Sequence, residues 1–392
     1  MSVIIVGGGM VGTTLALALS ELTNGSLPID IVEMNTPGEH QGDGFDNRSL
    51  ALAAGTCQRL EELGIWQYLS AQSQPIETIH ISDKGHAGLV TLDAKAHHLP
   101  AFGHVVELQN VGQTLFSLIT RQPNIRLHCP AKMVDVSRSE GGITIRLDNG
   151  EILCGKLAIA ADGVHSSLGS QLGMTWVRKD YHQTAVIANV QMSAPKANWA
   201  FERFTSHGPL ALLPTRHGRN SLVWCHKSDV SAEVLSWSDE KFKRYLLSEF
   251  GQRLGSIERV GQRQSYPLSL NYCERHVSHR LAMVGNAAQM LHPIAGQGFN
   301  LGFRDVATLA TLIKQAIDKG EDIGDYALLA YYQQLRRKDQ QQMIKLTNGL
   351  VNLFSDSQMV KAAVRNAGMM LMSHSSLMQR LLIDKTLGQY KR

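Results

Sequence analysis

The stretch Val3–Gly12, which reads VIIVGGGMVG, decides the fold of this chain. Its first four residues form a continuous apolar run, typical of a strand buried on both faces of a parallel sheet. The glycines that follow have the spacing GxGxxG. Gly7 suits a tight turn, Gly9 lets the backbone approach a pyrophosphate, and Gly12 allows close packing of a helix on the strand. The helix that follows would direct its positive end and its unpaired N–H groups toward phosphates.

A second strand, Ile29–Glu33, is predicted to complete a strand–helix–strand unit. Glu33 lies 21 residues after Gly12, where a carboxylate can bind ribose hydroxyls. The alternative is a purely structural glycine turn, because GxGxxG alone is a weak signal. Because the strand, the helix and Glu33 follow at the expected spacing, the segment predicts nucleotide binding. It does not distinguish NAD from FAD.

Two further motifs follow buried strands. Leu157–Gly163 is an apolar run ending in Asp-Gly, and Val284–Ala288 is another run that opens into a loop. That loop continues as His292–Asn300, with the glycine-rich piece GQGFN immediately before a predicted long helix. Such a loop lets the backbone come close to a flat ring, and the helix N-terminus can stabilise negative charge on that ring.

The order and separation of the three motifs resemble those of the single-Rossmann flavoprotein hydroxylases of the para-hydroxybenzoate hydroxylase type. The segments Asp46–Leu52, Val105–Leu108 and Gly208–Leu210 narrow the resemblance to the ubiquinone-biosynthesis hydroxylases. Within that family the resemblance is closest to the 2-octaprenyl-6-methoxyphenol hydroxylases, and it covers most of the chain.

The expected fold is α/β: a discontinuous Rossmann-like FAD-binding domain with an inserted β-sheet substrate domain and a helical C-terminus. Arg48–Trp66 is expected to be rich in helix, and Ser236 is expected to cap a helix that runs to about Phe250. The expected boundaries are 1–75, 101–180 and 276–340 for the FAD-binding domain, 76–100 and 181–275 for the substrate domain, and 341–392 for the C-terminal helical segment.

The resemblance also implies roles for individual residues. Arg48 would lie against the flavin or its pyrophosphate, with a surface helix arginine as the alternative. Gln113 would contact the cofactor or be a solvated helix glutamine. The other implied cofactor-binding residues are Gly7, Gly9, Gly12 and Glu33 for the ADP half of FAD, Asp162 and Gly163 near the pyrophosphate, Gly285 and Asn286 in the third motif, and Gly296, Gln297, Gly298 and Asn300 beside the isoalloxazine ring.

This chain departs from the family pattern at two positions. Asn286 stands where the third motif usually has aspartate; an amide keeps an acceptor and adds donors but loses the charge. Gly169 stands where the family often has arginine, which leaves the NAD(P)H contacts open.

The resemblance implies an FAD-dependent monooxygenase that uses NAD(P)H and O2. A flavin C4a-hydroperoxide would hydroxylate a polyprenylated (methoxy)phenol in ubiquinone biosynthesis, because the side chains alone cannot activate oxygen. His292 and Pro293 are the predicted catalytic residues. The catalytic base stays open among five histidines: His80, His182, His207, His226 and His292.

Two other functions stay open. One is another FAD-dependent oxidoreductase, a dehydrogenase or prenyl reductase, although the chain has no second GxGxxG and no cysteine pair. The other is a non-catalytic flavin-bound component of a biosynthetic complex. A hydroxylase incorporates oxygen into its product, whereas a dehydrogenase or reductase does not. A hydroxylase also shows NAD(P)H-stimulated turnover, whereas a non-catalytic flavin-bound component does not.

The composition of the chain indicates which partners and which cell compartment to expect. The 392 residues carry 38 basic and 34 acidic side chains without a basic cluster, so nucleic acid is not an expected partner. The five cysteines lie far apart, which gives no support to a metal site. The chain lacks a signal-peptide pattern and an apolar run of ~20 residues, so we expect a cytoplasmic protein.

The methionine-rich segment after Asp356 is expected to form helices that pack on their own domain. The alternative is a peripheral contact with the inner membrane or with other ubiquinone-biosynthesis proteins, since a polyprenyl substrate resides in lipid.

Overall fold

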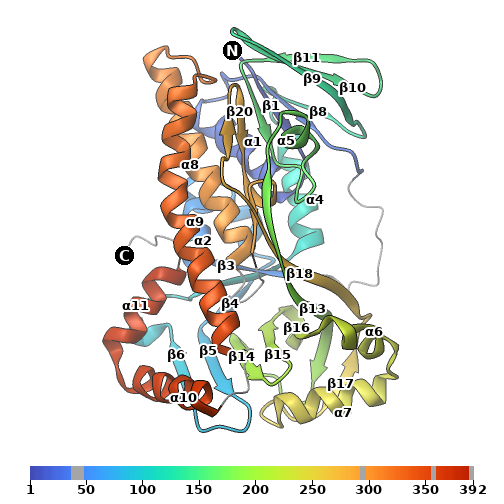
Figure 1. The fold of residues 1–392 in the computed structure, drawn as a ribbon, viewed down its shortest axis with the longest axis vertical. Helices are drawn as coiled ribbons and strands as arrows, with labels where there is room; N and C mark the ends of the chain where they lie inside the picture. The colour runs from blue at the N-terminus through green and yellow to red at the C-terminus, as the bar shows by residue number, and fades with distance from the viewer. Residues whose placement is uncertain (37–47, 292–296, 355–358, 388–392) are drawn as a thin grey trace.

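The structure is a computed structural model that describes residues 1–36, 48–291, 297–354 and 359–387. For residues 297, 350–354, 359–365 and 367 it describes the backbone alone. The molecule is elongated, with a parallel sheet at one end of the long axis and a larger sheet at the other (Figure 1).

The parallel sheet is built around the N-terminal strand. Its order is β19-β20-β12-β1-β2-β8, and only the edge strand β19 is antiparallel to its neighbour. The strands are β1 (Val3–Val6), β2 (Ile29–Val32), β8 (Ile125–His128), β12 (Leu157–Ala160), β19 (Val277–Ser278) and β20 (Leu281–Met283). Because these strands come from separate stretches of the chain, the sheet is discontinuous in sequence. The α/β expectation is confirmed.

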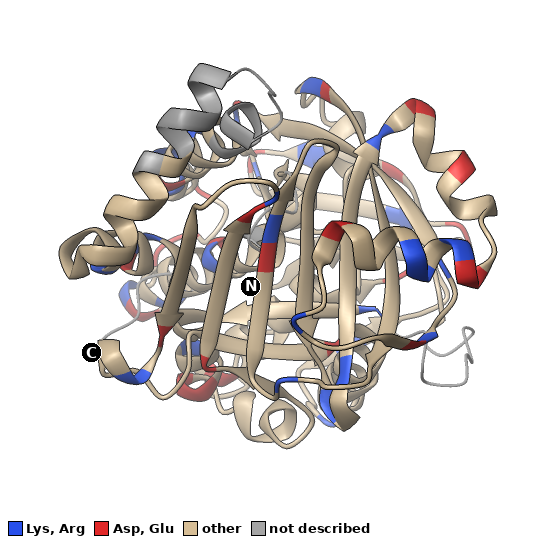
Figure 2. Cartoon of the chain, turned by 90° about the horizontal axis from the view of Figure 1, so that it is seen from below, with Lys and Arg blue, Asp and Glu red and all other residues tan. Residues whose placement is uncertain are grey.

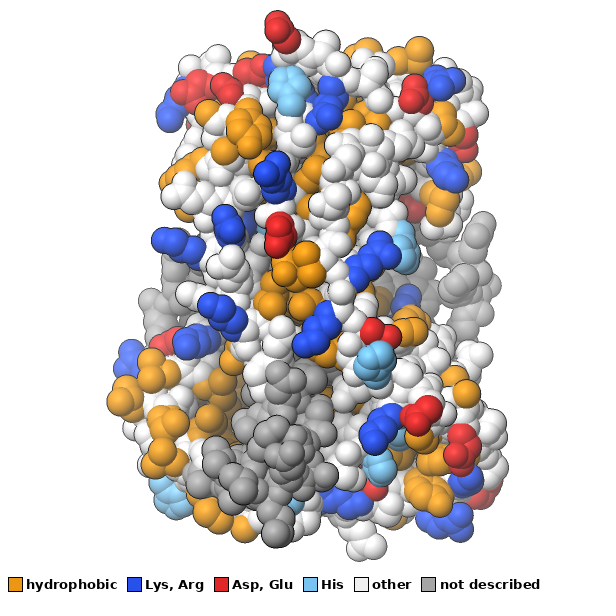
Figure 3. Space-filling view, viewed as in Figure 1, with side chains coloured by type: hydrophobic (Ala, Val, Ile, Leu, Met, Phe, Trp, Pro, Cys, Tyr) orange, Lys and Arg blue, Asp and Glu red, His pale blue; other side chains and the backbone are white. Residues whose placement is uncertain are grey.

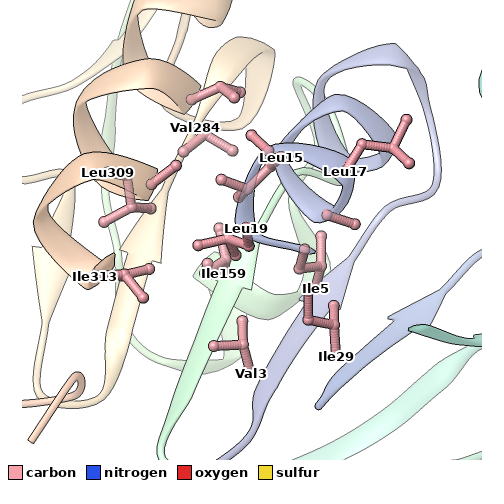
Figure 4. Close-up of a cluster of buried hydrophobic side chains, with 14 of the residues drawn as sticks. Val3, Ile5, Leu15, Leu17, Leu19, Ile29, Ile159, Val284, Leu309 and Ile313 are labelled. Carbon is pink, nitrogen blue, oxygen red and sulfur yellow. The ribbon is translucent and has the colours of Figure 1, made fainter. Parts of the chain in front are cut away.

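Helices cover this sheet. They are α1 (Met10–Leu22), α4 (Leu108–Ile119), α5 (Ser167–Gln171) and α8 (Gln297–Lys319). Figure 4 shows side chains of β1, α1 and α8 meeting in one cluster, with Ile5 below Leu15 and Leu19 and with Leu309 opposite them. Every residue of β1 is buried, as predicted from its apolar run.

A three-stranded antiparallel sheet lies at the same end of the molecule (Figure 1). It consists of β9 (Met133–Ser139), β10 (Gly142–Leu147) and β11 (Ile152–Gly155). The turn between β10 and β11 contains Asn149 and Gly150, and Gly150 has φ +88°. An Asn-Gly pair favours a tight hairpin turn, and β10 pairs antiparallel with β11 across it.

The large sheet lies at the opposite end. Its order is β21-β18-β13-β16-β15-β14-β5-β6, and β17 pairs with β13. The strands are β5 (Thr78–Asp83), β6 (Leu89–Asp93), β13 (Trp176–Met192), β14 (Trp199–Thr205), β15 (Gly208–Pro214), β16 (Arg219–Lys227), β17 (Ile257–Val260), β18 (Gln264–Cys273) and β21 (Gln289–Met290). Figure 2 looks at this sheet from below and shows that its strands carry few charged residues.

A small sheet, in the order β3-β7-β4, joins the two ends. It consists of β3 (Ser49–Ala53), β4 (Gln74–Ile76) and β7 (Gly103–Glu107). Between β3 and β4 the chain forms two helices, α2 (Ala54–Glu62) and α3 (Trp66–Ser70). The expectation that Arg48–Trp66 is rich in helix is confirmed for α2 but is wrong at the start of the segment, where residues 49–53 form a strand. Residues 49–53 pair with β7, and these ladder hydrogen bonds override the local preference for helix.

A second correction concerns Ser236. It ends α6 (Ser228–Ser236) and does not cap the next helix, α7 (Asp239–Phe250). The cap is Ser238, whose hydroxyl accepts a hydrogen bond from the Lys241 N–H at 3.2 Å. Ser238 has extended backbone angles, which an N-cap requires, whereas Ser236 is already helical.

Three helices follow α8: α9 (Tyr326–Phe354), α10 (Met359–His374) and α11 (Ser376–Thr386). The side chain of Asn366 holds α10 to the turn after β5, accepting from Gly88 N at 2.7 Å and donating to Asp83 Oδ2 at 3.2 Å. Met369 and Ile383 are buried against β6 and its neighbours. These faces of α10 and α11 therefore pack on the strands of the large sheet. Among the described residues, every helix is too short or too polar for a membrane span.

Candidate cofactor and substrate site

The glycine-rich turn after β1 is closed on one side and open on the other. Gly7 has φ +108°, and a Cβ there would lie 2.4 Å from the carbonyl oxygen of Ala161. A Cβ at Gly12 would lie 1.9 Å from the carbonyl oxygen of Gly7, so the helix contacts the strand directly. A Cβ at Gly9 would meet nothing within 4 Å. Gly9 is also the N-cap of α1 and offers no side-chain cap, which leaves the first N–H groups of α1 open to an anion.

Glu33 lies directly over this turn. Its Oε2 accepts a hydrogen bond from Gly8 N at 2.6 Å, and its Oε1 accepts one from Asn35 N at 2.8 Å. The carboxylate is thus fixed at the carboxyl end of β2, beside the open side of the turn. That is where the sequence predicts it.

Asp162 stands beside the same turn, since a Cβ at Gly7 would lie 2.7 Å from Asp162 N. One carboxyl oxygen, Oδ2, accepts hydrogen bonds from Ser167 N at 2.7 Å and from Leu168 N at 3.2 Å. The other, Oδ1, is buried and has no hydrogen-bond partner among the described residues. Gly163 has φ +80° and open space where a side chain would be.

The third motif brings α8 against α1. Gly285 lies in contact with Val11, and a Cβ at Gly302 would lie 2.9 Å from the Gly285 Cα. Gly285 N donates to Asp305 Oδ2 at 3.1 Å, which fixes the loop after β20. The side chain of Asn286 is exposed beside this contact.

Asn300 ties the first turn of α8 to the small sheet. Its Oδ1 accepts from Ala53 N and Thr56 Oγ1, both at 2.8 Å, and its Nδ2 donates to Ala51 O at 3.0 Å. Gly298 has open space at its Cα. The predicted residues His292, Pro293 and Gly296 lie outside the described residues, as does the side chain of Gln297.

Two predicted cofactor residues are on the surface. Arg48 donates from Nη1 to the Tyr266 hydroxyl at 3.1 Å, and its guanidinium lies 5.6 Å from the centre of the Tyr266 ring. It precedes strand β3, so the alternative of a surface helix arginine is wrong. Gln113 is exposed on α4.

Beyond Asn300 lies a cavity of about 400 Å³. It is bounded by the large sheet, by β3 and β4, and by α9, α10 and α11. Its wall is almost entirely apolar; representative residues are Leu52, Ile81, Val90, Phe204, Ala211, Val223, Met343, Leu346, Met369, Met372, Leu382 and Ile383. Such a volume is within the range of about 300–1,000 Å³ that is typical of small-molecule sites.

Glu202 is the one charged side chain in this wall among the described residues. Burial raises the pKa of its carboxyl from 4.5 to about 7, because the surroundings disfavour the charged form. Burial, and then Glu202, also raise the pKa of the neighbouring Cys225 thiol. Glu202 is a functional candidate that the sequence analysis did not name. A carboxylate flanked by apolar residues in the stretch AFERF is the signal that could have indicated it.

The described candidate histidines do not reach the cavity. His80 packs against the rings of Trp199 and Phe201, and His226 lies 4.3 Å from the ring of Trp224, centre to centre. Burial is the main cause that lowers the pKa of each to about 4. His182 and His207 are exposed. These four are absent from the cavity wall as the structure describes it.

Comparison with known proteins identifies the family. The family of the FAD binding domain matches residues 1–347. A ubiquinone hydroxylase, UbiL of Rhodospirillum rubrum, is 37% identical, and the alignment covers 99% of this chain and 90% of that protein. This chain belongs to the FAD-dependent monooxygenase family that contains the ubiquinone hydroxylases. The resemblance stated from the sequence is confirmed.

Other members of the ubiquinone hydroxylase family match nearly end to end. The 3-demethoxyubiquinol 3-hydroxylase of Escherichia coli is 29% identical over 98% of this chain and 97% of its own. The human mitochondrial ubiquinone biosynthesis monooxygenase COQ6 is 28% identical over 94% of this chain and 88% of its own.

Solved structures support the fold of this flavoprotein monooxygenase. The p-nitrophenol 4-monooxygenase PnpA of Pseudomonas putida superposes with a TM-score of 0.81 at 18% identity, covering 100% of this chain and 98% of that one. A single-residue variant of HpxO of Klebsiella pneumoniae, complexed with FAD, superposes with a TM-score of 0.77 at 16% identity, and the alignment covers 99% of both chains.

Proposed function

We propose that this monooxygenase hydroxylates the ring of a polyprenylated phenol in ubiquinone biosynthesis, with FAD as cofactor and NAD(P)H and O2 as co-substrates. The observation that carries this proposal is the apolar cavity of about 400 Å³ next to the first turn of α8. The names of the ubiquinone hydroxylases among its relatives support the substrate class.

The turn after β1 has room and chemistry for FAD. The uncapped N-terminus of α1 and the open space at Gly9 suit the pyrophosphate, and Gly7 and Gly12 form the base of the turn. Glu33 would bind the ribose of the adenosine half. The buried, unpartnered Oδ1 of Asp162 needs a donor, and a cofactor hydroxyl would supply it.

Further residues would complete the cofactor site. Arg48, just before β3, and Gln113, on α4, would contact FAD from the surface. Gly163, which has no side chain, would leave space for the cofactor. Asn286, Gly298 and the loop before α8 would border the ring system. Bound FAD supplies the two-electron chemistry with NAD(P)H and the transfer of oxygen from O2.

The cavity would hold the phenol ring and part of the prenyl chain. Its apolar wall favours a hydrocarbon chain, and its exclusion of water protects the reactive oxygen species from wasteful decay. Its volume is near the lower end of the range for small-molecule sites, so a long prenyl chain would extend beyond it.

The outer face of α10 and α11 is the proposed route for that chain and the proposed contact with a lipid surface. Leu371, Leu377 and Leu381 are 59%, 67% and 55% exposed on the same helices that supply Met369 and Ile383 to the cavity wall. Figure 3 shows hydrophobic side chains gathered over this part of the molecule. Exposed Arg380 and Lys385 lie among them, as expected for a peripheral contact with anionic lipid.

The test is turnover under ¹⁸O₂. Purified protein loaded with FAD is given NAD(P)H and a prenylated 2-methoxyphenol. We expect one ¹⁸O atom in a ring hydroxyl of the product, with NAD(P)H consumption stimulated by the phenol. Reduction of the substrate without ¹⁸O would instead identify another FAD-dependent oxidoreductase. FAD binding without NAD(P)H-stimulated turnover would identify a non-catalytic component.

A further inference from the structure

Glu202 occupies the middle of β14 and faces the cavity. Side chains alternate along a strand, so Ala200, Glu202 and Phe204 share one face of the large sheet. In the sheet ladder Glu202 lies opposite Ala211 of β15 and opposite Ile81 of β5. All five of these residues line the cavity. The carboxyl is thus set among apolar side chains from three neighbouring strands.

This carboxyl has no evident structural role. Among the described residues it makes no hydrogen bond or ion pair, in contrast to the buried Asp305, which has both. Shielding a charged group from water without a partner is unfavourable in general, and Glu202 is half-buried in an apolar wall, so an apolar residue here would give a more stable sheet. A group retained at that cost in the wall of a substrate cavity points to a task in the reaction.

The chemistry of the proposed function supplies such a task. A phenol ring attacks an electrophilic oxygen more readily once its hydroxyl has lost the proton, because the phenolate is richer in electrons. Water cannot accept the proton inside an apolar cavity. A carboxylate that accepts it keeps the total charge of the buried pair at one negative charge, so no new charge has to be buried.

We propose that Glu202 is the catalytic base that takes the proton from the phenolic hydroxyl of the substrate, an inference that rests on the proposed function. The phenolic O–H bond breaks, an O–H bond forms on the carboxylate, and the electron pair stays on the phenolate oxygen. After the ring has been hydroxylated, the proton returns to the product phenolate. Glu202 is then ionised again.

The acidity of the group suits this role. A base works best when its pKa lies close to the working pH, and burial raises the pKa of the Glu202 carboxyl to about 7. The other titratable group that the described elements direct into the cavity is the Cys225 thiol on β16, whose pKa burial raises, so it stays neutral in this range. Of the residues that the structure describes, Glu202 is therefore the one on which the pH profile of ring hydroxylation would report.

The decisive variant is Glu202→Gln, which keeps the size and polarity of the side chain but cannot accept the proton. General base catalysis contributes about 10²–10⁴-fold. We expect single-turnover hydroxylation to fall by at least ~10²-fold, and the ionisation near pH 7 to vanish from the profile. Glu258→Gln, an exposed position on β17 of the same sheet, is the matched control and keeps the wild-type rate and profile.

A second readout needs neither NAD(P)H nor oxygen. A nitrophenol that carries a short prenyl chain absorbs visible light when ionised. The FAD-loaded wild-type protein should bind it in the ionised form at pH 8, above the pKa of about 7 of Glu202, because the carboxylate is then available to take its proton. Glu202→Gln should bind it in the neutral form. Glu202→Asp, which restores a carboxyl, should bring back ionised probe.

The outcomes separate this inference from the proposed function. FAD content and the thermal midpoint show whether each variant folds, and Glu202→Leu, which is apolar like the rest of the cavity wall and cannot accept a proton, replaces Glu202→Gln if the latter does not. A wild-type protein that neither hydroxylates the phenol nor binds the probe would overturn the proposed function. A wild-type protein that does both, matched by Glu202→Gln in rate, profile and probe ionisation, would overturn the role of Glu202 alone.

Discussion

Asp305 on α8 and Arg336 on α9 form an ion pair with 2.7 Å between Oδ1 and Nε, and their side chains are 0% and 3% exposed. The second oxygen of Asp305 accepts the N–H of Gly285, in the loop that the third motif predicts to border the cofactor. Arg336 also pairs with Asp339 at 2.7 Å. One buried ion pair therefore fixes the position of the loop after β20 relative to α9, the helix that supplies part of the cavity wall.

Removing this carboxylate should destabilise the protein. Asp305→Ala leaves a buried guanidinium with one partner instead of two and leaves Gly285 N without its acceptor. Breaking a buried pair from one side costs about 3–5 kcal/mol. We expect a loss of this size in the free energy of unfolding, measured by urea denaturation of the apoprotein.

The same helix provides the control. Lys314 and Asp318 form an exposed pair on α8, with exposed side-chain fractions of 31% and 56%. Exposed pairs contribute about 0–1 kcal/mol, so Asp318→Ala should change the free energy of unfolding by no more than that. Equal losses in the two variants would contradict a structural role for the buried pair.

Two glycines of the first motif should separate cofactor binding from folding. Gly9→Ala meets no atom of the protein, so the apoprotein should keep its thermal midpoint within a few degrees while the Kd for FAD rises by at least ~10-fold, or ~1.4 kcal/mol. Gly12→Ala would place its Cβ 1.9 Å from the Gly7 carbonyl oxygen and should lower the midpoint of the apoprotein itself. Fluorescence titration with FAD and thermal melting measure the two effects. An unchanged Kd in Gly9→Ala would count against the proposed pyrophosphate site.

His226 should make the protein sensitive to acid. Burial, and then His207, lower its folded-state pKa from 6.5 to about 4, so the unfolded chain binds the extra proton between these pH values. The stability contributed by neutral His226 is therefore complete above pH 6.5 and is lost as the pH falls toward 4. The full effect is worth roughly 3 kcal/mol at ~1.4 kcal/mol per pKa unit.

The variant His226→Phe removes this titration and keeps a ring against Trp224. We expect its free energy of unfolding to fall less steeply between pH 6.5 and 4 than that of the wild type, as measured by urea denaturation at several pH values. His182→Gln, at a side chain that is 87% exposed, should keep the wild-type slope. A wild-type slope in His226→Phe would show that His226 is already protonated in the folded state.

The outer face of α10 and α11 should govern binding to lipid. Replacing Leu371, Leu377 and Leu381 together by serine removes apolar surface worth about 0.8 kcal/mol per buried CH₂. We expect at least ~10-fold weaker cosedimentation with anionic vesicles, with unchanged thermal stability, because all three side chains are exposed.

Three exposed apolar residues elsewhere provide the control for this experiment. Val134, Ile152 and Val177 lie on β9, β11 and β13, away from the C-terminal helices. Replacing them by serine should leave vesicle binding unchanged. Equal losses in the two triple variants, or none in either, would exclude the outer face of α10 and α11 as the lipid contact.

The sequence determined the elements whose interactions are local. An apolar run, three glycines at fixed spacing and an amphipathic helix specify β1, the turn and α1, because each constraint acts within a few residues. Glu33 could be placed beside that turn because it directly follows the second strand, whereas the family resemblance placed Asp162 there. The family, and with it FAD, followed from the order of these motifs.

Tertiary structure decided the rest. Residues 49–53 form a strand because β7, which begins 50 residues after Ala53 in the chain, supplies their hydrogen bonds. The cavity exists because strands from two distant stretches and three C-terminal helices meet around it. Glu202 illustrates the difference: the aromatic residues on either side of it favour a strand, but only the register of β14 with β5 and β15 determines that its carboxyl faces an apolar cavity. That environment raises its pKa, and no local pattern encodes an environment assembled from remote parts of the chain.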